Sequence, residues 1–97
     1  MEIYLLEQNI CTGYATYDSV VVCAENESNA RTISPDNYVT HFKDGNWMGT
    51  RNDRSEYENN GYDWVMFKDI DKIKVTHIGK ANELQKRGVI LSSFNAG

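Results

Sequence analysis

The sequence predicts an α+β fold: a single small domain over residues 1–97, with a mostly antiparallel sheet and one short helix packed on a face. Ninety-seven residues supply one hydrophobic core and leave no room for a second. Several short segments combine β-branched and aromatic residues in the way that is typical of strands. Only one segment, which begins near Asn26, carries the start and stop signals of a helix.

Two strands are expected in the N-terminal part of the chain. EIYLLEQ (2–8) is short and apolar on both faces, which favours an inner strand over a helix. The connection that follows turns at Gly13. SVVVCAE (19–25) is the strongest strand signal, because consecutive valines are restricted at χ1 and favour a pleated sheet. We expect this strand to be the best-protected element, so that Val21→Asp would be strongly destabilising.

A short helix is expected next. Asn26 can accept hydrogen bonds from the free amides of the first turn, and Glu27 suits the positive end of the helix dipole. Ala30 and Ile33 are three residues apart and can both face the sheet. Pro35 ends the helix, because the residue before a proline avoids the helical conformation.

Residues 36–61 form a variable hairpin and loop region. The segments YVTHF and WMGTR flank Asp44-Gly45, a dipeptide that is typical of a tight hairpin turn. The polar segment 52–61 shows no periodicity, and we expect a mobile loop that folding does not require.

Three further strands complete the expected sheet. They are YDWVMF (62–67), KIKVTHI (72–78) and GVILSSF (88–94). In the second of these, apolar residues alternate with lysines, which is typical of a strand with one face in water.

Charge and hydropathy exclude several classes of function. The net charge is −4 and the isoelectric point is about 5.0. Domains that bind duplexes are usually basic, so nucleic-acid binding is disfavoured. No apolar run approaches the roughly 18 residues that cross a bilayer, and no basic leader of a signal peptide precedes the first strand. We therefore expect no membrane association and a cytoplasmic location.

The cysteines, histidines and carboxylates form no recognisable catalytic or metal-binding motif. Cys11 and Cys23 belong to no CxxC pair, which argues against a zinc site. Either His41 or His77 could act as a base beside Cys11, but any chain with two of each residue type offers such pairs. The carboxylates of segment 53–63 lack the spacing of a calcium loop. We expect no catalytic residues, no cofactor and no metal.

The aromatic residues of the first loop suggest a binding surface, because tyrosine and tryptophan are enriched where proteins meet partners. We expect the GYATYDS loop and the terminal SFNAG to meet at one end of the sheet, provided that the last strand runs parallel to the first. One tyrosine would then be the recognition ring, and the other would pack inward. The short polar side chains of the loop would hold it rigid. A loop that only closes the sheet is the alternative. The candidate binding residues are Tyr14, Tyr17, Asp18, Ser19, Phe94 and Asn95.

At GYATYDSVVVCAENESNAR (13–31) and GVILSSFNAG (88–97), the chain resembles a family of short uncharacterised proteins from bacteriophages, prophages and gut metagenomes. Members of that family carry a GYDTYDS-like loop, a valine-rich strand and a terminal SFNAG. Ala15 stands where that pattern usually has an aspartate, so no role of that carboxylate carries over. The resemblance brings no chemistry with it. It implies a phage accessory protein that acts in the cytosol of a bacterial host.

Three functions remain open at this point. Small size, loop aromatics and the phage resemblance favour a protein-binding module, such as an inhibitor of a bacterial defence system and in particular an anti-CRISPR protein. Its partner would be a host or phage protein. A pocket at the Tyr14–Ser19 loop would instead favour a small-ligand binder or minor enzyme. An exposed sheet edge that forms a homodimer would favour a structural or assembly protein.

Overall fold

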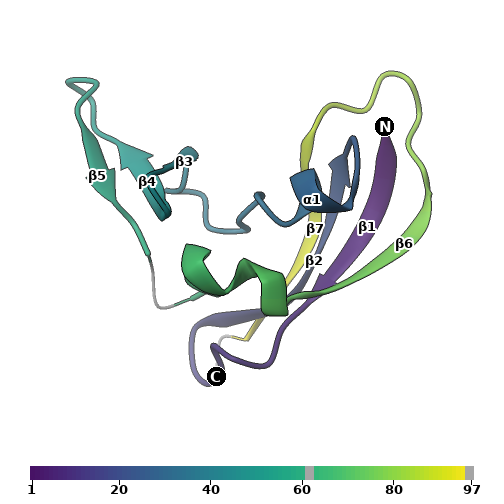
Figure 1. Ribbon diagram of the computed structural model, residues 1–97, viewed down its shortest axis with the longest axis horizontal. Coiled ribbons are helices and arrows are strands. Elements are labelled where there is room, and N and C mark those ends of the chain that lie inside the picture. Colours follow the sequence, from purple (N-terminus) through teal and green to yellow (C-terminus); the bar gives the residue numbers. More distant parts are fainter. Residues whose placement is uncertain (61–62, 96–97) are drawn as a thin grey trace.

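The structure is a computed structural model that describes residues 1–60 and 63–95. Figure 1 shows two antiparallel sheets with short helical segments beside the larger one. The α+β class predicted from the sequence, with its mostly antiparallel strands, is confirmed. The division of the strands between two sheets was not predicted. The strands of the larger sheet are β1 (Glu2–Glu7), β2 (Thr16–Ala24), β6 (Lys74–Lys80) and β7 (Gly88–Asn95).

The larger sheet has the strand order β6-β1-β2-β7, so β1 and β2 are its inner strands, as expected. All three pairings are antiparallel, and β7 therefore runs parallel to β1. Side chains alternate along β2. Val20 and Val22 are buried, whereas Val21 is only half-buried and lies opposite Leu5 on the other face. The expectation that Val21→Asp would place a charge in the core is therefore wrong, because the buried valines are Val20 and Val22.

The predicted helix is shorter than expected. α1 spans Glu27–Ala30, and its N-cap is Asn26, whose Oδ1 accepts a hydrogen bond from the Asn29 amide at 2.8 Å. Beyond Ala30, the Ile33 amide still donates to the Ala30 carbonyl, so the chain makes one further tight turn before Pro35. Ala30 and Ile33 are both buried, as the three-residue spacing predicted.

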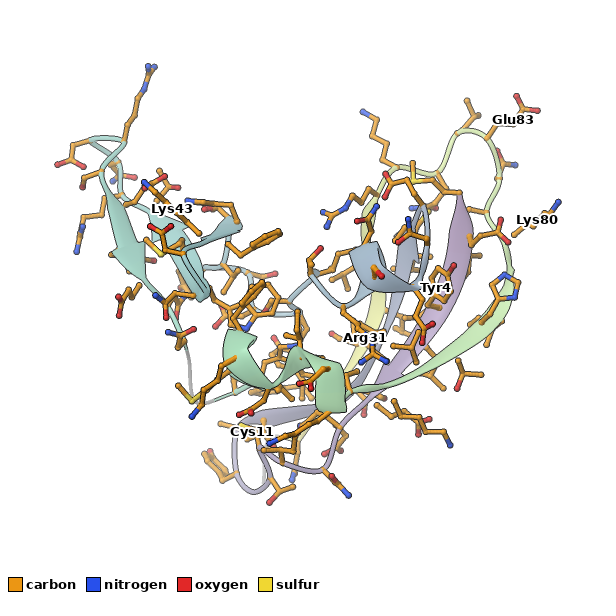
Figure 2. All side chains as sticks on the ribbon, in the orientation of Figure 1. Tyr4, Cys11, Arg31, Lys43, Lys80 and Glu83 are labelled. Atoms are coloured by element: carbon orange, nitrogen blue, oxygen red, sulfur yellow. The ribbon has the colours of Figure 1, made fainter. Side chains whose placement is uncertain are left out.

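Arg31 joins α1 to the second helical segment, the 3₁₀ helix η1 (Phe67–Lys72). One terminal nitrogen of its guanidinium donates to the carbonyls of Ile70 and Ile73, at 2.7 and 2.5 Å. Figure 2 shows Arg31 reaching from α1 toward η1, beside the sheet face that carries Tyr4. The guanidinium thus satisfies carbonyl groups at the end of η1.

The strand predicted over 62–67 is wrong for Asp63–Phe67; residue 62 lies outside the described residues. Residues 63–67 take part in no strand pairing, and Trp64 and Val65 are both buried, at 3% and 1% exposure. The buried indole nitrogen of Trp47 donates to the Val65 carbonyl at 2.8 Å. This segment is therefore an irregular linker packed between layers, and η1 follows it.

The smaller sheet consists of β3 (His41–Lys43), β4 (Asn46–Thr50) and β5 (Glu56–Glu58). The hairpin turn at Asp44-Gly45 is confirmed, and both residues have positive φ, 52° and 78°. The prediction of a mobile loop over 52–61 is wrong for Glu56–Glu58, which pair with β4; residue 61 lies outside the described residues.

The main core lies on the helix side of the larger sheet and extends to the smaller sheet through Trp47. Its buried members are Tyr4, Leu6, Val20, Val22, Ala24, Ala30, Ile33, Trp47, Trp64, Val65 and Ile73. Across residues 1–60 and 63–95, no helix has the length and apolarity that crossing a membrane requires.

Candidate functional site

The GYATYDS loop and the C-terminal strand lie side by side. The β2–β7 register places Thr16 opposite Asn95 and Tyr17 opposite Phe94. The Ala15 amide donates to the Asn95 carbonyl at 2.6 Å, and the Asn95 side-chain amide donates to the Gly13 carbonyl at 2.9 Å. Residues 96–97 of the expected SFNAG contact lie outside the described residues.

Gln8, at the end of β1, holds this loop in shape. Its side-chain nitrogen donates to the carbonyls of Cys11 and Tyr17, each at 2.7 Å. Its side-chain oxygen accepts from the amides of Ile10 and Cys11, at 2.9 and 2.8 Å. One amide group therefore bridges both arms of the loop. The sequence offers no signal for this role beyond a glutamine at a strand end.

Asp18 and Ser19 do not brace the loop as expected. Within the described residues, neither side chain makes a hydrogen bond. Asp18 instead occupies a β-bulge, at which the pairing passes from Tyr17–Phe94 to Ser19–Ser93. The extra residue turns Tyr17 toward the core while Ser19 keeps to the opposite face.

The two loop tyrosines have different environments. Tyr14 is 77% exposed, at the tip of the loop. Tyr17 is half-buried and packs against the main core and against the Phe94 ring, with centroids 4.8 Å apart. Tyr14 is therefore the ring available to a partner, and Tyr17 is the ring that packs inward.

A partly buried carboxylate lies beneath the loop. The Tyr17 amide donates to the Asp63 carbonyl at 2.8 Å. Burial raises the pKa of the Asp63 carboxyl to about 6, and a hydrogen bond that the protonated carboxyl donates to Asp36, together with the negative charge of Asp36, acts in the same direction. Oδ1 of Asp63 is buried and has no hydrogen-bond partner among the described residues.

Cys11 is a poor candidate for a nucleophile. Figure 2 shows it in the loop at the far end of β1 from residue 1. Burial, and next the negative charge of Asp63, raise the pKa of the Cys11 thiol above its usual value. The same two causes, with a smaller effect of Asp36, raise the pKa of Tyr17. A raised thiol pKa lowers the thiolate population, and the thiolate is the reactive form.

β7 adds an exposed apolar edge to the loop. It is an edge strand of the larger sheet and carries no charged side chain, whereas the opposite edge strand, β6, begins and ends with lysine. Leu91 is 67% exposed and Phe94 is 49% exposed. Native edges are usually protected by charges, so an uncharged, apolar edge is available for contact with another chain.

Each of the two histidines is hydrogen-bonded to a glutamate. His77 Nε2 lies 2.8 Å from a Glu2 carboxylate oxygen, and His41 Nε2 lies 2.9 Å from Glu56. Glu56 also binds Lys43 at 3.0 Å, which lowers the pKa of Glu56. Within the described ranges, no group of three or more His, Cys, Asp or Glu side chains is arranged to hold a metal ion.

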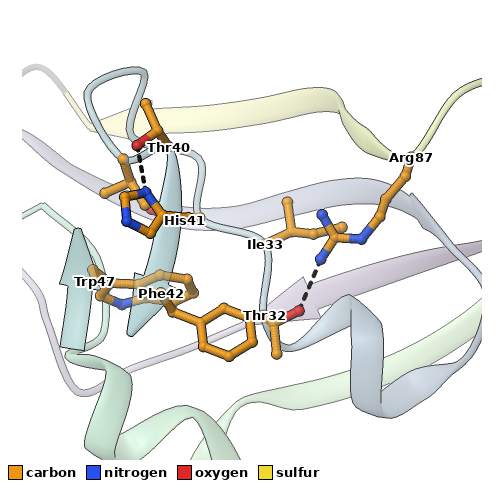
Figure 3. Close-up of a pocket in the computed structure, with 9 residues that line it drawn as sticks. Thr32, Ile33, Thr40, His41, Phe42, Trp47 and Arg87 are labelled. Atoms are coloured by element: carbon orange, nitrogen blue, oxygen red, sulfur yellow. Dashed lines mark hydrogen bonds between the residues drawn. The ribbon is translucent and has the colours of Figure 1, made fainter. Parts of the chain in front are cut away.

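A pocket of about 350 Å³ opens between the turn after α1, the hairpin strand β3 and the loop that precedes β7 (Figure 3). Arg87 contributes nitrogen donors, Ser34 contributes a hydroxyl, and Ile33 and Phe42 contribute apolar surface; both ring nitrogens of His41, which also lines the pocket, are engaged by Thr40 and Glu56. Sequence reasoning missed this pocket, because these residues come from segments that no motif connects.

Comparison with protein-family models, with curated proteins and with solved structures found no significant match for the chain.

Proposed function

We propose that this chain is a phage-type accessory protein that acts in the bacterial cytosol by binding another protein, and that it inhibits a host defence system such as CRISPR. The observation that carries the binding function is a pair of exposed aromatic rings, Tyr14 and Phe94, at the end of the sheet where the loop meets β7, called here the loop–β7 surface. The resemblance to phage proteins supports the host setting.

The loop–β7 surface has the composition of a protein interface. An exposed tyrosine contributes large area and a polar handle with little loss of conformational freedom. The adjoining strand is apolar and uncharged, so burying it against a partner desolvates no ionic group. Its free edge also offers backbone groups to an extended segment of the partner.

The loop is held rigid before any partner arrives. Gln8 and the Ala15–Asn95 hydrogen bond fix its backbone, and the Tyr17–Phe94 contact supports it from below. Rigidity lowers the entropy lost on binding, which favours recognition over simple closure of the sheet.

The test is a pull-down from a bacterial host with tagged wild-type protein and two tyrosine variants, scored by mass spectrometry. Tyr14→Ala is the test variant. Tyr38→Ala is its matched control, because Tyr38 is equally exposed, at 74%, and belongs to the α1–β3 connection. We expect one partner that Tyr14→Ala loses and Tyr38→Ala retains, with both variants folded.

Other outcomes would contradict the proposal and point to the alternatives. A bound metabolite without a protein partner would favour the small-ligand binder or minor enzyme at the Tyr14–Ser19 loop. A stable homodimer through β7, measured by light scattering, would favour an assembly protein. Equal loss of the partner in both tyrosine variants would remove the loop–β7 surface from recognition.

A further inference from the structure

The pocket between α1 and β3 combines a cation, free hydrogen-bond donors and an aromatic wall. None of its described lining residues is acidic, although the chain has 14 acidic and 10 basic residues. Arg87 is the charged group among these lining residues.

Arg87 is held in place while part of its guanidinium stays open. One terminal nitrogen donates to Thr32 Oγ1 at 2.8 Å and approaches the Asn29 carbonyl at 3.4 Å. The other terminal nitrogen has no partner among the described residues. Glu25 is 4.0 Å from Nε, and both side chains are more than two-fifths exposed, so this pair is weak. A fixed guanidinium with open donors suits a carboxylate or phosphate.

A hydroxyl donor and an apolar wall complete the pocket. Ser34 Oγ accepts a hydrogen bond from the Asp36 amide, and its own hydrogen has no acceptor among the described residues. The Phe42 ring stacks on Phe67 at 4.8 Å, so it is supported from behind while it remains half-exposed. Figure 3 shows Arg87 and Phe42 approaching the space beside Ile33 from opposite sides.

From this arrangement we infer that the pocket binds a small organic anion in which a phosphate or carboxylate is joined to one planar ring. The anionic group contacts Arg87 and Ser34, and the ring packs on Phe42 and Ile33. The volume of about 350 Å³ lies at the lower end of ligand sites and limits the ligand to roughly this size. Because Arg87 precedes β7, the pocket lies at the opposite end of this strand from the Tyr14 loop, and the inference is independent of the protein-binding function.

The probe is phenyl phosphate, titrated into ¹⁵N-labelled protein and followed by amide chemical shifts. For a ligand of this size, a Kd on the order of 1 mM is expected. Shifts should centre on Ile33, Ser34 and Phe42. Inorganic phosphate and phenol, which each carry half of the probe, should bind more weakly.

Two variants with the same charge change decide the outcome. Arg87→Gln should weaken binding by about tenfold or more, because it removes charge-assisted hydrogen bonds. Lys86→Gln, one residue away and outside the lining, should change the Kd by less than about twofold. Ser34→Ala, which leaves the Arg87 contacts intact, should weaken binding by several-fold. Equal losses in the two charge variants, shifts centred elsewhere, or no binding up to about 10 mM would overturn the inference.

Discussion

Tyr17 and Phe94 face each other across the β2–β7 pair, with ring centroids 4.8 Å apart and ring planes inclined by 51°. Tyr17 also contacts the main core, whereas one side of Phe94 is open to solvent. The contact connects the first loop of the chain with its last described strand, and so supports the surface on which Tyr14 lies.

Replacing the two rings separately and together should reveal their coupling. Tyr17→Ala should destabilise the protein more than Phe94→Ala, because Tyr17 loses core contacts as well. The double-mutant cycle should give a coupling of about 0.5–1.5 kcal/mol from denaturant unfolding. Tyr14→Ala should change stability by less than about 0.5 kcal/mol. If the stability loss of the double variant equals the sum of the two single losses, the rings do not support each other.

The alternation of β2 predicts opposite results for neighbouring valines. Val22→Asp should cost at least about 3 kcal/mol, because it places an unpaired charge in the main core. Val21→Asp should cost less than about 2 kcal/mol, since that side chain is half-buried on the face turned away from the helices. Urea unfolding of both variants checks this order. If the two losses are equal, the assignment of faces is wrong.

Local signals predicted the regular part of the fold well. The consecutive valines, the Asn26 cap and the Asp44-Gly45 turn each act within a few residues, so they could be read from the sequence. The segment 63–66 could not, because Trp64 and Val65 are buried in a core whose other members come from distant parts of the chain. An alternating aromatic pattern does not distinguish a strand from an irregular segment enclosed between layers.

β5 was missed for a related reason. Its strand character depends on the cross-strand pair Gly49–Tyr57, in which the glycine leaves room for the ring. A polar segment with a single aromatic residue shows no period of its own, so only the pairing partner reveals it.

Gly49→Ala should therefore destabilise the smaller sheet. An added Cβ would overlap the Tyr57 ring, which the Arg51 guanidinium covers at 4.9 Å from the ring centroid. The expected loss is about 1–3 kcal/mol in thermal unfolding. Gly79→Ala is the matched control, because a Cβ there meets nothing within 4 Å, and its loss should stay below about 0.5 kcal/mol. A loss in the control as large as that in Gly49→Ala would exclude the ring as the cause.

The raised pKa of Asp63, about 6 against an ordinary value of 3.8, predicts a pH dependence of stability. The folded protein holds this proton more tightly than the unfolded chain does. The contribution is therefore complete below about pH 4 and is lost as the pH rises through about 6. Asp63→Asn should remove this dependence. The difference in unfolding free energy between variant and wild type should shift in favour of the variant by on the order of 1 kcal/mol from pH 4.5 to 7.5, since solvent screens a partly exposed group.

Asp36→Asn provides the control for this titration. It leaves Asp63 in place but removes the neighbouring negative charge, so the pH dependence should become smaller without vanishing. A difference that stays constant with pH in Asp63→Asn would show that this carboxyl does not titrate as stated.

The candidate site was accessible to sequence reasoning only in part. The contact between the loop and β7 could be predicted, because it requires only that the last strand run parallel to the first. The roles of Gln8 and Arg87 depend on side chains that bridge distant backbone groups, and no spacing rule anticipates them. The expected bracing by Asp18 and Ser19 failed because a bulge, invisible in the sequence, turns the chain at that point.

The strand order β6-β1-β2-β7 has a consequence for synthesis on the ribosome. β1 and β2 form an early hairpin whose two outer edges are completed only by strands that begin at Lys74 and Gly88. At ordinary elongation rates, the roughly 50 intervening residues take on the order of 2–10 seconds to appear. During that interval the β1–β2 hairpin presents two unpaired edges, and the nascent chain is at its most vulnerable to aggregation. The smaller sheet, whose strands are neighbours in sequence, can form in the meantime because its loops close quickly.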